Sequence, residues 1–307
     1  METIIRFLPK TIADMINRIP PSQQEGIEEI RIRINRPIEI TMDGALVFLP
    51  YVILPEDAFH LMNKISHFSI YAIEEELKRG YITVSGGHRI GLAGKVILEE
   101  GKVKAIRDVS SFNIRIAKER TGIANSIIPY VFMSEWMHTM IIGPPQTGKT
   151  TLLRDLARAI SSGDSNNARP AVKVGIVDER SEIAGCVNGV PQLTFGHRVD
   201  VLDACPKAEG MMMMIRSMSP DVLIVDEIGR KEDAEAIMEA VHAGIKLMMT
   251  THGNSLADIR KRPSLREILD QDIFQRYIVL SRKQGPGTIA HIFDGNGNEM
   301  SRKVSVR

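Results

Sequence analysis

The chain has 307 residues, about twice the length of a typical single domain, so two domains are expected. Hydrophobic residues make up 43% and charged residues 25%, close to the averages of globular proteins, which argues against a disordered, collagen-like or coiled-coil chain. The 39 Lys and Arg residues balance 38 Asp and Glu residues, and this balance disfavours a dedicated nucleic-acid binder.

No segment of the sequence approaches the ~20 uninterrupted apolar residues that cross a membrane. The first residues also lack the basic region and the apolar core of a signal peptide. We therefore expect a cytoplasmic protein that meets a membrane only through its partners.

Residues 1–121 are predicted to form a small α+β domain. Residues 28–34 alternate apolar and charged side chains, as a half-buried strand does. Apolar spacing predicts helices over 56–65 and 69–79, and Gly80 ends the second helix. Four more strands are predicted at 81–85, 88–98, 102–107 and 112–117.

Residues 122–307 are predicted to form an α/β domain. A helix-like connector over 122–133 precedes a series of apolar strands with helical segments between most of them. This alternation predicts a parallel sheet that is covered by helices on both faces. The strands are expected at 138–142, 172–177, 221–225, 246–251 and 277–281.

The first of these strands is followed by a complete GxxxxGK[ST] motif, the P-loop or Walker A sequence, and then by a predicted helix over 151–160. In such a loop, backbone N–H groups surround the β-phosphate, Lys149 bridges the β- and γ-phosphates, and the Thr150 hydroxyl reaches Mg²⁺. A chance glycine-rich turn is the alternative, but the strand–loop–helix context disfavours it. The predicted nucleotide-binding residues are Gly143, Pro144, Pro145, Gln146, Thr147, Gly148, Lys149, Thr150 and Thr151.

A second strand supplies the acidic residues that a P-loop requires. Residues 222–225 are apolar, and Asp226 and Glu227 follow them in a Walker B pattern. Asp226 is the metal-side candidate, with Thr150, and Glu227 is a candidate to polarise the attacking water. The sequence after the P-loop contains no Asn-Lys-x-Asp guanine-binding motif, so ATP is favoured over GTP.

Two further strands also end in polar clusters. Carboxylates occur at 178–182, in the run Asp-Glu-Arg-Ser-Glu, and the run Thr-Thr-His-Gly-Asn-Ser occupies 250–255. Ligands of open α/β sheets gather at the carboxyl ends of strands. His252 is therefore a candidate to sense a γ-phosphate, although a lone histidine is more often structural.

In their order and spacing, these four elements resemble those of the secretion ATPases, the motors of type II and type IV secretion and of pilus extension and retraction. The resemblance implies a RecA-like P-loop ATPase domain with a smaller N-terminal α+β domain, and a homo-oligomer, usually a hexameric ring. Glu182 matches the family's acidic-box glutamate. Since Asp226 stands where the family often has glycine, the water-activating role stays open between Glu182 and Glu227, with Glu182 preferred.

The same resemblance implies that arginines of the first domain reach the nucleotide. Arg89 and Arg115 lie on predicted strands at similar positions, and Arg107 is a third candidate. The alternative for each is a solvated strand arginine. The implied catalytic set is thus Glu182, Glu227, Lys149, His252, Arg89 and Arg115.

Over nearly its whole length the chain also resembles a family of sporulation ATPases from endospore-forming bacteria. The residues that carry this resemblance are 29–33 with 36–37, 86–95, 106–111 with 113–115, and the P-loop. It implies a mother-cell protein that docks on integral membrane subunits of a channel complex linking mother cell and forespore.

Two other functions remain to be weighed against an ATP-driven motor. A nucleic-acid translocase on a RecA-like core is disfavoured by the charge balance, so no nucleic-acid partner is expected. An ATP-gated scaffold would hydrolyse ATP negligibly. The run Met211–Met214 is interpreted as part of a buried helix rather than as an adaptable partner surface.

Overall fold

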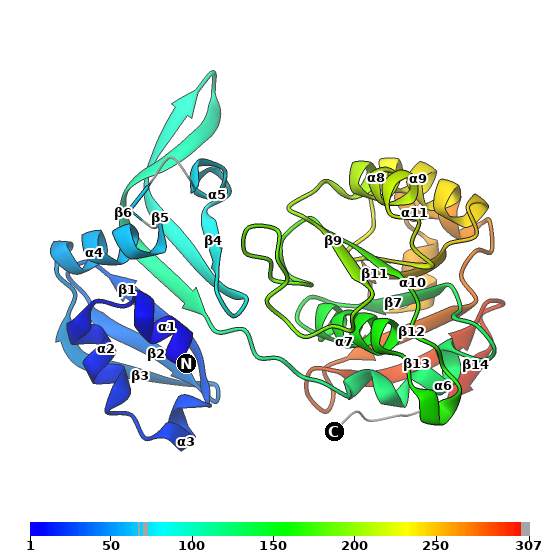
Figure 1. The fold of residues 1–307 in the computed structure, drawn as a ribbon, viewed down its shortest axis with the longest axis horizontal. Coiled ribbons are helices and arrows are strands. Elements are labelled where there is room, and N and C mark those ends of the chain that lie inside the picture. The colour runs from blue at the N-terminus through cyan, green and yellow to red at the C-terminus, as the bar shows by residue number, and fades with distance from the viewer. Residues whose placement is uncertain (67, 70–72, 302–307) are drawn as a thin grey trace. The chain divides into compact units, whose positions relative to one another are not determined.

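The computed structural model describes residues 1–66, 68–69 and 73–301, and it divides the chain into two compact units, Met1–Lys118 and Glu119–Arg307 (Figure 1). Each unit has its own sheet and its own hydrophobic core. Within the described residues, no helix is both long and apolar enough to cross a membrane.

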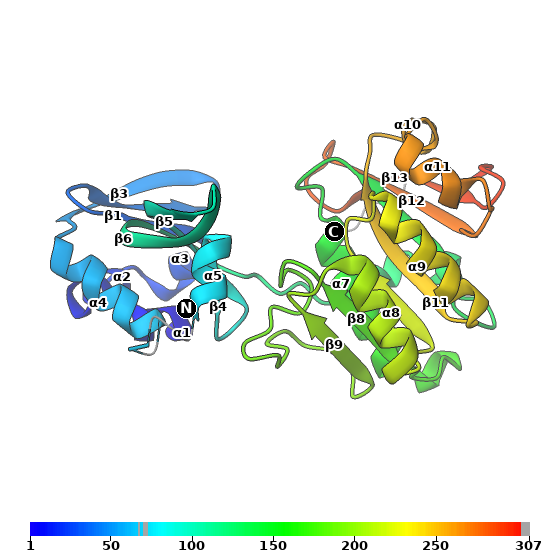
Figure 2. The same ribbon diagram turned by 90° about the horizontal axis from the view of Figure 1, so that it is seen from above.

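The first unit is built on a six-stranded antiparallel sheet in the order β3-β2-β1-β6-β5-β4. Its helices lie on one face of the sheet (Figure 2), and their buried Ile and Leu side chains pack on the strands. The strands are β1 (Ile27–Arg33), β2 (Pro37–Met42), β3 (Ala45–Val52), β4 (Tyr81–Val84), β5 (His88–Glu99) and β6 (Lys102–Arg115). The helices are α1 (Glu2–Phe7), α2 (Lys10–Asn17), α3 (Pro21–Gln24), α4 (Pro55–Ile65) and α5 (Glu74–Arg79).

Two elements predicted for this unit differ in extent from those in the structure. The strands predicted at 102–107 and 112–117 form the single strand β6, because the polar stretch between them is accommodated by a register shift opposite Gly94. There Asp108 has a φ of +49°, and a Cβ on Gly94 would lie 2.6 Å from the Asp108 carbonyl oxygen. Of the helix predicted over 69–79, residues 70–72 lie outside the described residues. Helix α5 ends at Arg79, and Gly80, whose φ is +82°, caps it.

The second unit contains an eight-stranded sheet in the order β14-β13-β12-β7-β11-β10-β8-β9. The strands from β12 to β9 run parallel, as predicted for β7, β8, β10, β11 and β12, whereas β13 and β14 are antiparallel additions that were not predicted. The strands are β7 (Thr139–Gly143), β8 (Val174–Asp178), β9 (Val199–Asp203), β10 (Val222–Val225), β11 (Lys246–His252), β12 (Arg276–Ser281), β13 (Thr288–Asp294) and β14 (Glu299–Ser301).

Helices cover both faces of this sheet, as predicted. One core includes Leu152 and Leu156 of α7, and the other includes Met211 of α8, Ile237 of α9 and Leu265 of α11. The connector over 122–133 is not one helix but a 3-10 turn and one α-helical turn, because Pro129 starts a new segment. The helical segments are η2 (Ile123–Ser126), α6 (Ile128–Val131), α7 (Lys149–Ser162), η3 (Ser165–Asn167), α8 (Lys207–Ser217), α9 (Lys231–His242), α10 (Leu256–Arg260) and α11 (Pro263–Leu269).

Candidate nucleotide-binding site

The P-loop connects the end of β7 at Gly143 to the start of α7 at Lys149. Gly148 caps the helix with a φ of +87°, and Gln146 has a φ of +61°, so the backbone curls around the helix N-terminus. A Cβ on Gly143 would lie 2.5 Å from the Thr147 hydroxyl oxygen, which excludes a larger residue without a shift. A curled loop before a helix N-terminus presents backbone N–H groups to an anion, as phosphate sites require.

Lys149 is buried beside this loop. Its Nζ donates a hydrogen bond to the Pro144 carbonyl oxygen at 3.0 Å and lies 3.2 Å from His252 Nδ1. Burial lowers the pKa of Lys149, while the negative charges of Asp226 and Glu227 act in the opposite direction. A bound phosphate could therefore replace the contacts of the Lys149 ammonium group with Pro144 and His252.

Thr150 on α7 and Asp226, just after β10, are joined by a hydrogen bond between their side chains. The Thr150 hydroxyl donates to Asp226 Oδ2 at 2.5 Å, and the buried Thr250 hydroxyl donates to Asp226 Oδ1. Hydroxyl and carboxylate oxygens are the donors that Mg²⁺ prefers. In the described part of the chain, no group of three His, Cys, Asp or Glu side chains could hold a metal. A Mg²⁺ ion held by Thr150 and Asp226 would complete its shell with phosphate oxygens and water, as Mg²⁺ in nucleotide sites commonly does.

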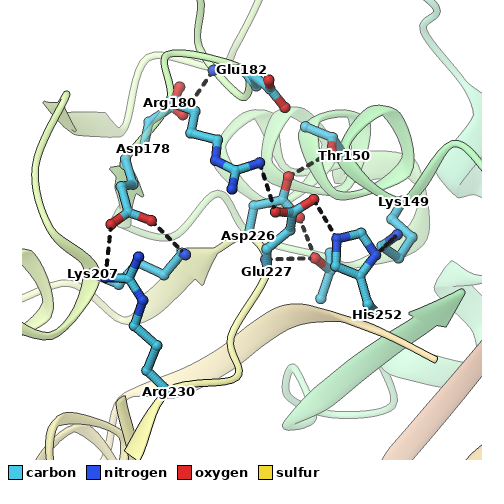
Figure 3. Close-up of polar contacts among 12 residues, drawn as sticks. Lys149, Thr150, Asp178, Arg180, Glu182, Lys207, Asp226, Glu227, Arg230 and His252 are labelled. Atoms are coloured by element: carbon cyan, nitrogen blue, oxygen red, sulfur yellow. Dashed lines mark hydrogen bonds and ion pairs between the residues drawn. The ribbon is translucent and has the colours of Figure 1, made fainter. Parts of the chain in front are cut away.

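Glu227 is held at both carboxylate oxygens (Figure 3). His252 Nε2 lies 2.9 Å from Oε1, and Arg180 Nη1 lies 3.0 Å from Oε2. One neutral tautomer of His252 satisfies both of its contacts, with Nε2–H donating to Glu227 and Nδ1 accepting from Lys149. His252 therefore links the P-loop lysine to the Walker B glutamate.

The acidic cluster after β8 divides into structural and pocket-facing carboxylates. Asp178 is buried and accepts hydrogen bonds from three successive backbone N–H groups, those of Glu182, Ile183 and Ala184. Burial raises the pKa of Asp178 to about 6, while these N–H groups act to lower it. Glu179 pairs with Lys207 at 2.6 Å. Asp178 thus shapes the turn that carries Glu182.

Glu182 belongs to the same pocket as the Walker B pair. The pocket is lined by the carboxylates Asp178, Glu179, Glu182, Asp226 and Glu227 with Arg180 and Lys207. The backbone carbonyl oxygen of Glu182 accepts a 2.6 Å hydrogen bond from Arg154 on α7. The structure therefore brings Lys149, Thr150, Asp226, Glu227, His252 and Glu182 together at one edge of the sheet.

Three arginines near the site were not identified from the sequence. Arg180 pairs with Glu227, Arg154 fixes the acidic turn, and Arg282 binds both the backbone oxygen and the side chain of Gln146. Arg282 precedes a turn between β12 and β13 that packs on the P-loop, where the Gly287 N–H donates to the Thr147 carbonyl at 2.8 Å. The run Gly285-Pro286-Gly287 signals this turn but not the contact.

Arg89, Arg107 and Arg115 lie in the first unit, so their contact with nucleotide stays a prediction. Arg89 and Arg115 are opposite each other on β5 and β6. The Arg89 guanidinium carbon stacks 3.4 Å from the centre of the Tyr81 ring, which restricts its side chain. Arg107 and Arg115 are exposed.

Comparison with known proteins gives one family and one fold. The model of the family described as Sporulation stage III, protein AA matches residues 1–300. The curated protein Stage III sporulation protein AA of Bacillus subtilis (strain 168) is 55% identical over 307 residues, which cover 100% of this chain and 99% of that protein.

Two solved structures share the fold at low sequence identity. The Legionella pneumophila ATPase DotB is 18% identical with a TM-score of 0.56, over 89% of this chain and 77% of that chain. The pilus retraction motor PilT with bound ADP is 16% identical with a TM-score of 0.58, over 84% and 75% of the two chains. These similarities confirm the predicted fold class, a RecA-like ATPase core with a smaller N-terminal domain.

Proposed function

Because the chain belongs to the Sporulation stage III, protein AA family, we propose that it is an ATP-hydrolysing motor of the secretion ATPase superfamily. In this proposal it energises the assembly of, or transport through, a channel complex between mother cell and forespore. The observation that supports hydrolysis best is the meeting of Lys149, Thr150, Asp226 and Glu227 at the mouth of the P-loop. The fold shared with an ATPase and a pilus motor agrees with this assignment.

Each residue has a distinct part in the proposed reaction. Backbone N–H groups of the P-loop bind the phosphates, and Lys149 exchanges its contacts with Pro144 and His252 for phosphate oxygens. Thr150 and Asp226 would hold Mg²⁺, which supplies charge neutralisation at the phosphates. Glu182 or Glu227 accepts a proton from the attacking water, and His252 couples Glu227 to the P-loop.

The proposal extends to assembly and place of action. A homo-oligomeric ring, hexameric as in the secretion ATPases, would bring Arg89 and Arg115 of the first unit to nucleotide at or near a subunit boundary. Integral membrane subunits of the channel complex would hold the ring at the membrane on the mother-cell side. No nucleic-acid partner forms part of this proposal.

Replacing the P-loop lysine tests the site assignment. Lys149→Ala should lower ATP turnover by about 100-fold or more, because a charged phosphate contact made in the transition state is lost. The fold should persist, since the loop is shaped by its glycines and backbone. Turnover is measured with Mg²⁺, and Lys261→Ala, at an exposed lysine, is the control.

The same assay separates the alternatives. Unchanged turnover in folded Lys149→Ala protein would contradict the site. No turnover by the wild-type protein at any concentration would favour an ATP-gated scaffold. Turnover that rises with DNA or RNA in a salt-dependent way would favour a nucleic-acid translocase.

A further inference from the structure

A groove runs between α8, α9 and α11 on one face of the second unit. Helices α8 and α9 pack side by side along it (Figure 2), and α11 packs on α9. The groove has a volume of about 1230 Å³. No residue that lines it belongs to the nucleotide site. We call it the Met–Glu groove, after its lining residues Met212, Met213, Met238, Glu209, Glu232, Glu235, Glu239 and Glu267.

The apolar residues of the groove lining, which we call its floor, include three methionines. Met211 and Met214 of α8 are buried in the core, whereas Met212 is half-buried and Met213 is 51% exposed. Met238 of α9 is half-buried beside them. The prediction of a buried helix is therefore right for one side of α8 and wrong for the other. Methionine is flexible and polarisable, so such a floor adapts to apolar side chains of different shapes.

The charged residues of the groove lining, which we call its rim, are mostly acidic. All five glutamates are exposed, and Arg216 is the only lysine or arginine among the lining residues that the structure gives. Within residues 1–66, 68–69 and 73–301, none of the five has an ion pair. Three of the nearby cations have other partners, since Lys207 and Arg230 pair with Glu179 and Arg266 pairs with Asp270.

We propose that the Met–Glu groove binds a cationic amphipathic helix of a partner protein. An apolar stripe at helical spacing on the partner would contact Met212, Met213 and Met238, and its flanking Lys or Arg side chains would meet the glutamates. The acidic rim selects positive charge and repels acidic segments. This inference goes beyond the proposed ATPase activity, because it assigns an interaction to a different surface.

Binding of a model helix tests the groove directly. The probe is a fluorescein-labelled 20-residue peptide of Leu and Lys in an amphipathic pattern, followed by fluorescence anisotropy with the full chain. The triple variant Glu235→Gln, Glu239→Gln, Glu267→Gln should weaken binding by about tenfold, equivalent to roughly 1.4 kcal/mol. Its matched control removes the charges of three exposed glutamates of the first unit, by Glu25→Gln, Glu75→Gln and Glu100→Gln.

A second pair of variants tests the apolar floor. Met213→Gln keeps the side-chain length but removes the apolar contact, so it should weaken binding severalfold. Met133→Gln, at a methionine that is 67% exposed outside the groove, should not. A peptide of the same composition with its apolar stripe scrambled should bind much less tightly, and added salt should weaken binding of the amphipathic peptide.

Three results would overturn the proposal. The wild-type protein fails to bind the amphipathic peptide, or the control triple variant loses as much affinity as the groove variant, or the scrambled peptide binds equally well. Sedimentation velocity covers the remaining alternative. Self-association that is lost only in the groove variants, without peptide binding, would make the groove an interface between copies of this chain and would contradict a helical partner.

Discussion

A single histidine connects the two charged ends of the candidate site. His252 contacts Lys149 through one ring nitrogen and Glu227 through the other, and Arg180 holds the second oxygen of Glu227. Each carboxylate oxygen of Glu227 therefore already accepts one contact, and together the two contacts fix the position of this side chain. Phosphate binding by Lys149 would remove the lysine from His252 and so rearrange the pair.

This geometry bears on which glutamate activates water. Glu182→Gln and Glu227→Gln should each keep ATP binding, because an amide preserves the shape of a carboxylate. Each should lose hydrolysis, and general-base assistance is worth ~10²–10⁴-fold. We propose Glu182 as the base, with Glu227 orienting the ligands around Mg²⁺. Single-turnover hydrolysis at saturating Mg²⁺ measures both variants.

The assignment fails if Glu182→Gln hydrolyses ATP at the wild-type rate and only Glu227→Gln is inactive. That result would support the usual Walker B mechanism. The variant Arg180→Gln tests the role of the Arg180–Glu227 pair in the same assay. It releases one oxygen of Glu227 and leaves both candidate carboxylates in place.

At the scale of elements, a buried histidine makes the first unit sensitive to acid. His88 at the start of β5 accepts a hydrogen bond at 3.0 Å from the backbone N–H of Ala117, just after β6. Burial lowers the pKa of His88 to about 4. In the unfolded chain His88 binds a proton as the pH falls through about 6.5, whereas in the folded chain it stays neutral until the pH nears 4. The contribution of neutral His88 to the free energy of unfolding is thus fully present above about pH 6.5. It is lost as the pH falls towards 4, by up to roughly 3 kcal/mol.

His88→Asn should remove much of this pH dependence, because the amide oxygen can accept the same hydrogen bond but does not titrate. Urea unfolding of both proteins at pH 7 and pH 5 measures the effect. The wild-type protein should lose more unfolding free energy between the two pH values than the variant does. Equal losses would show that His88 is not the titrating group.

Strong periodic patterns predicted the elements, and irregular contacts were missed. The apolar strands β7, β8, β10, β11 and β12 were located because each is buried on both faces. β9 was not, because all five of its residues are only half-buried and its sequence carries two aspartates. β13 and β14 were missed because antiparallel strands added to a parallel edge leave no helix between them to mark the pattern.

The residues of the candidate site also fall into those that were predicted and those that were missed. Its P-loop, Walker B and histidine residues are local in sequence, so spacing placed them. Arg180, Arg154 and Arg282 act through contacts between separate elements, such as that of Arg282 with Gln146 across 136 positions. No local pattern encodes such a contact. The functional boundary between residues 121 and 122, like the catalytic roles themselves, stays a prediction.

At the scale of the whole molecule, the arginines of the first unit test the proposed ring. An arginine that stabilises a phosphoryl-transfer transition state is typically worth ~10³–10⁵ in kcat, whereas a surface ion pair is worth ~0–1 kcal/mol. Arg89→Gln and Arg115→Gln together should therefore lower kcat of the assembled protein by about 1000-fold or more. Arg18→Gln, at an exposed arginine of the same unit, is the control.

The measurement must be made on protein that still assembles, as shown by sedimentation. A kcat within about twofold of the wild-type value would identify Arg89 and Arg115 as solvated strand arginines, the alternative left open by the sequence. Arg107→Gln, tested alone, shows whether the third candidate contributes.

The central claim, an ATPase that acts as an assembly of this chain, is tested most directly by ATP turnover per chain across a range of protein concentrations with Mg²⁺ present. Specific activity should rise steeply with concentration and level off as the assembly forms, and the Lys149→Ala protein should remain inactive throughout. Specific activity that is constant from the lowest concentration, with the protein monomeric by sedimentation, would contradict a ring motor, and turnover that survives Lys149→Ala would contradict the nucleotide site itself.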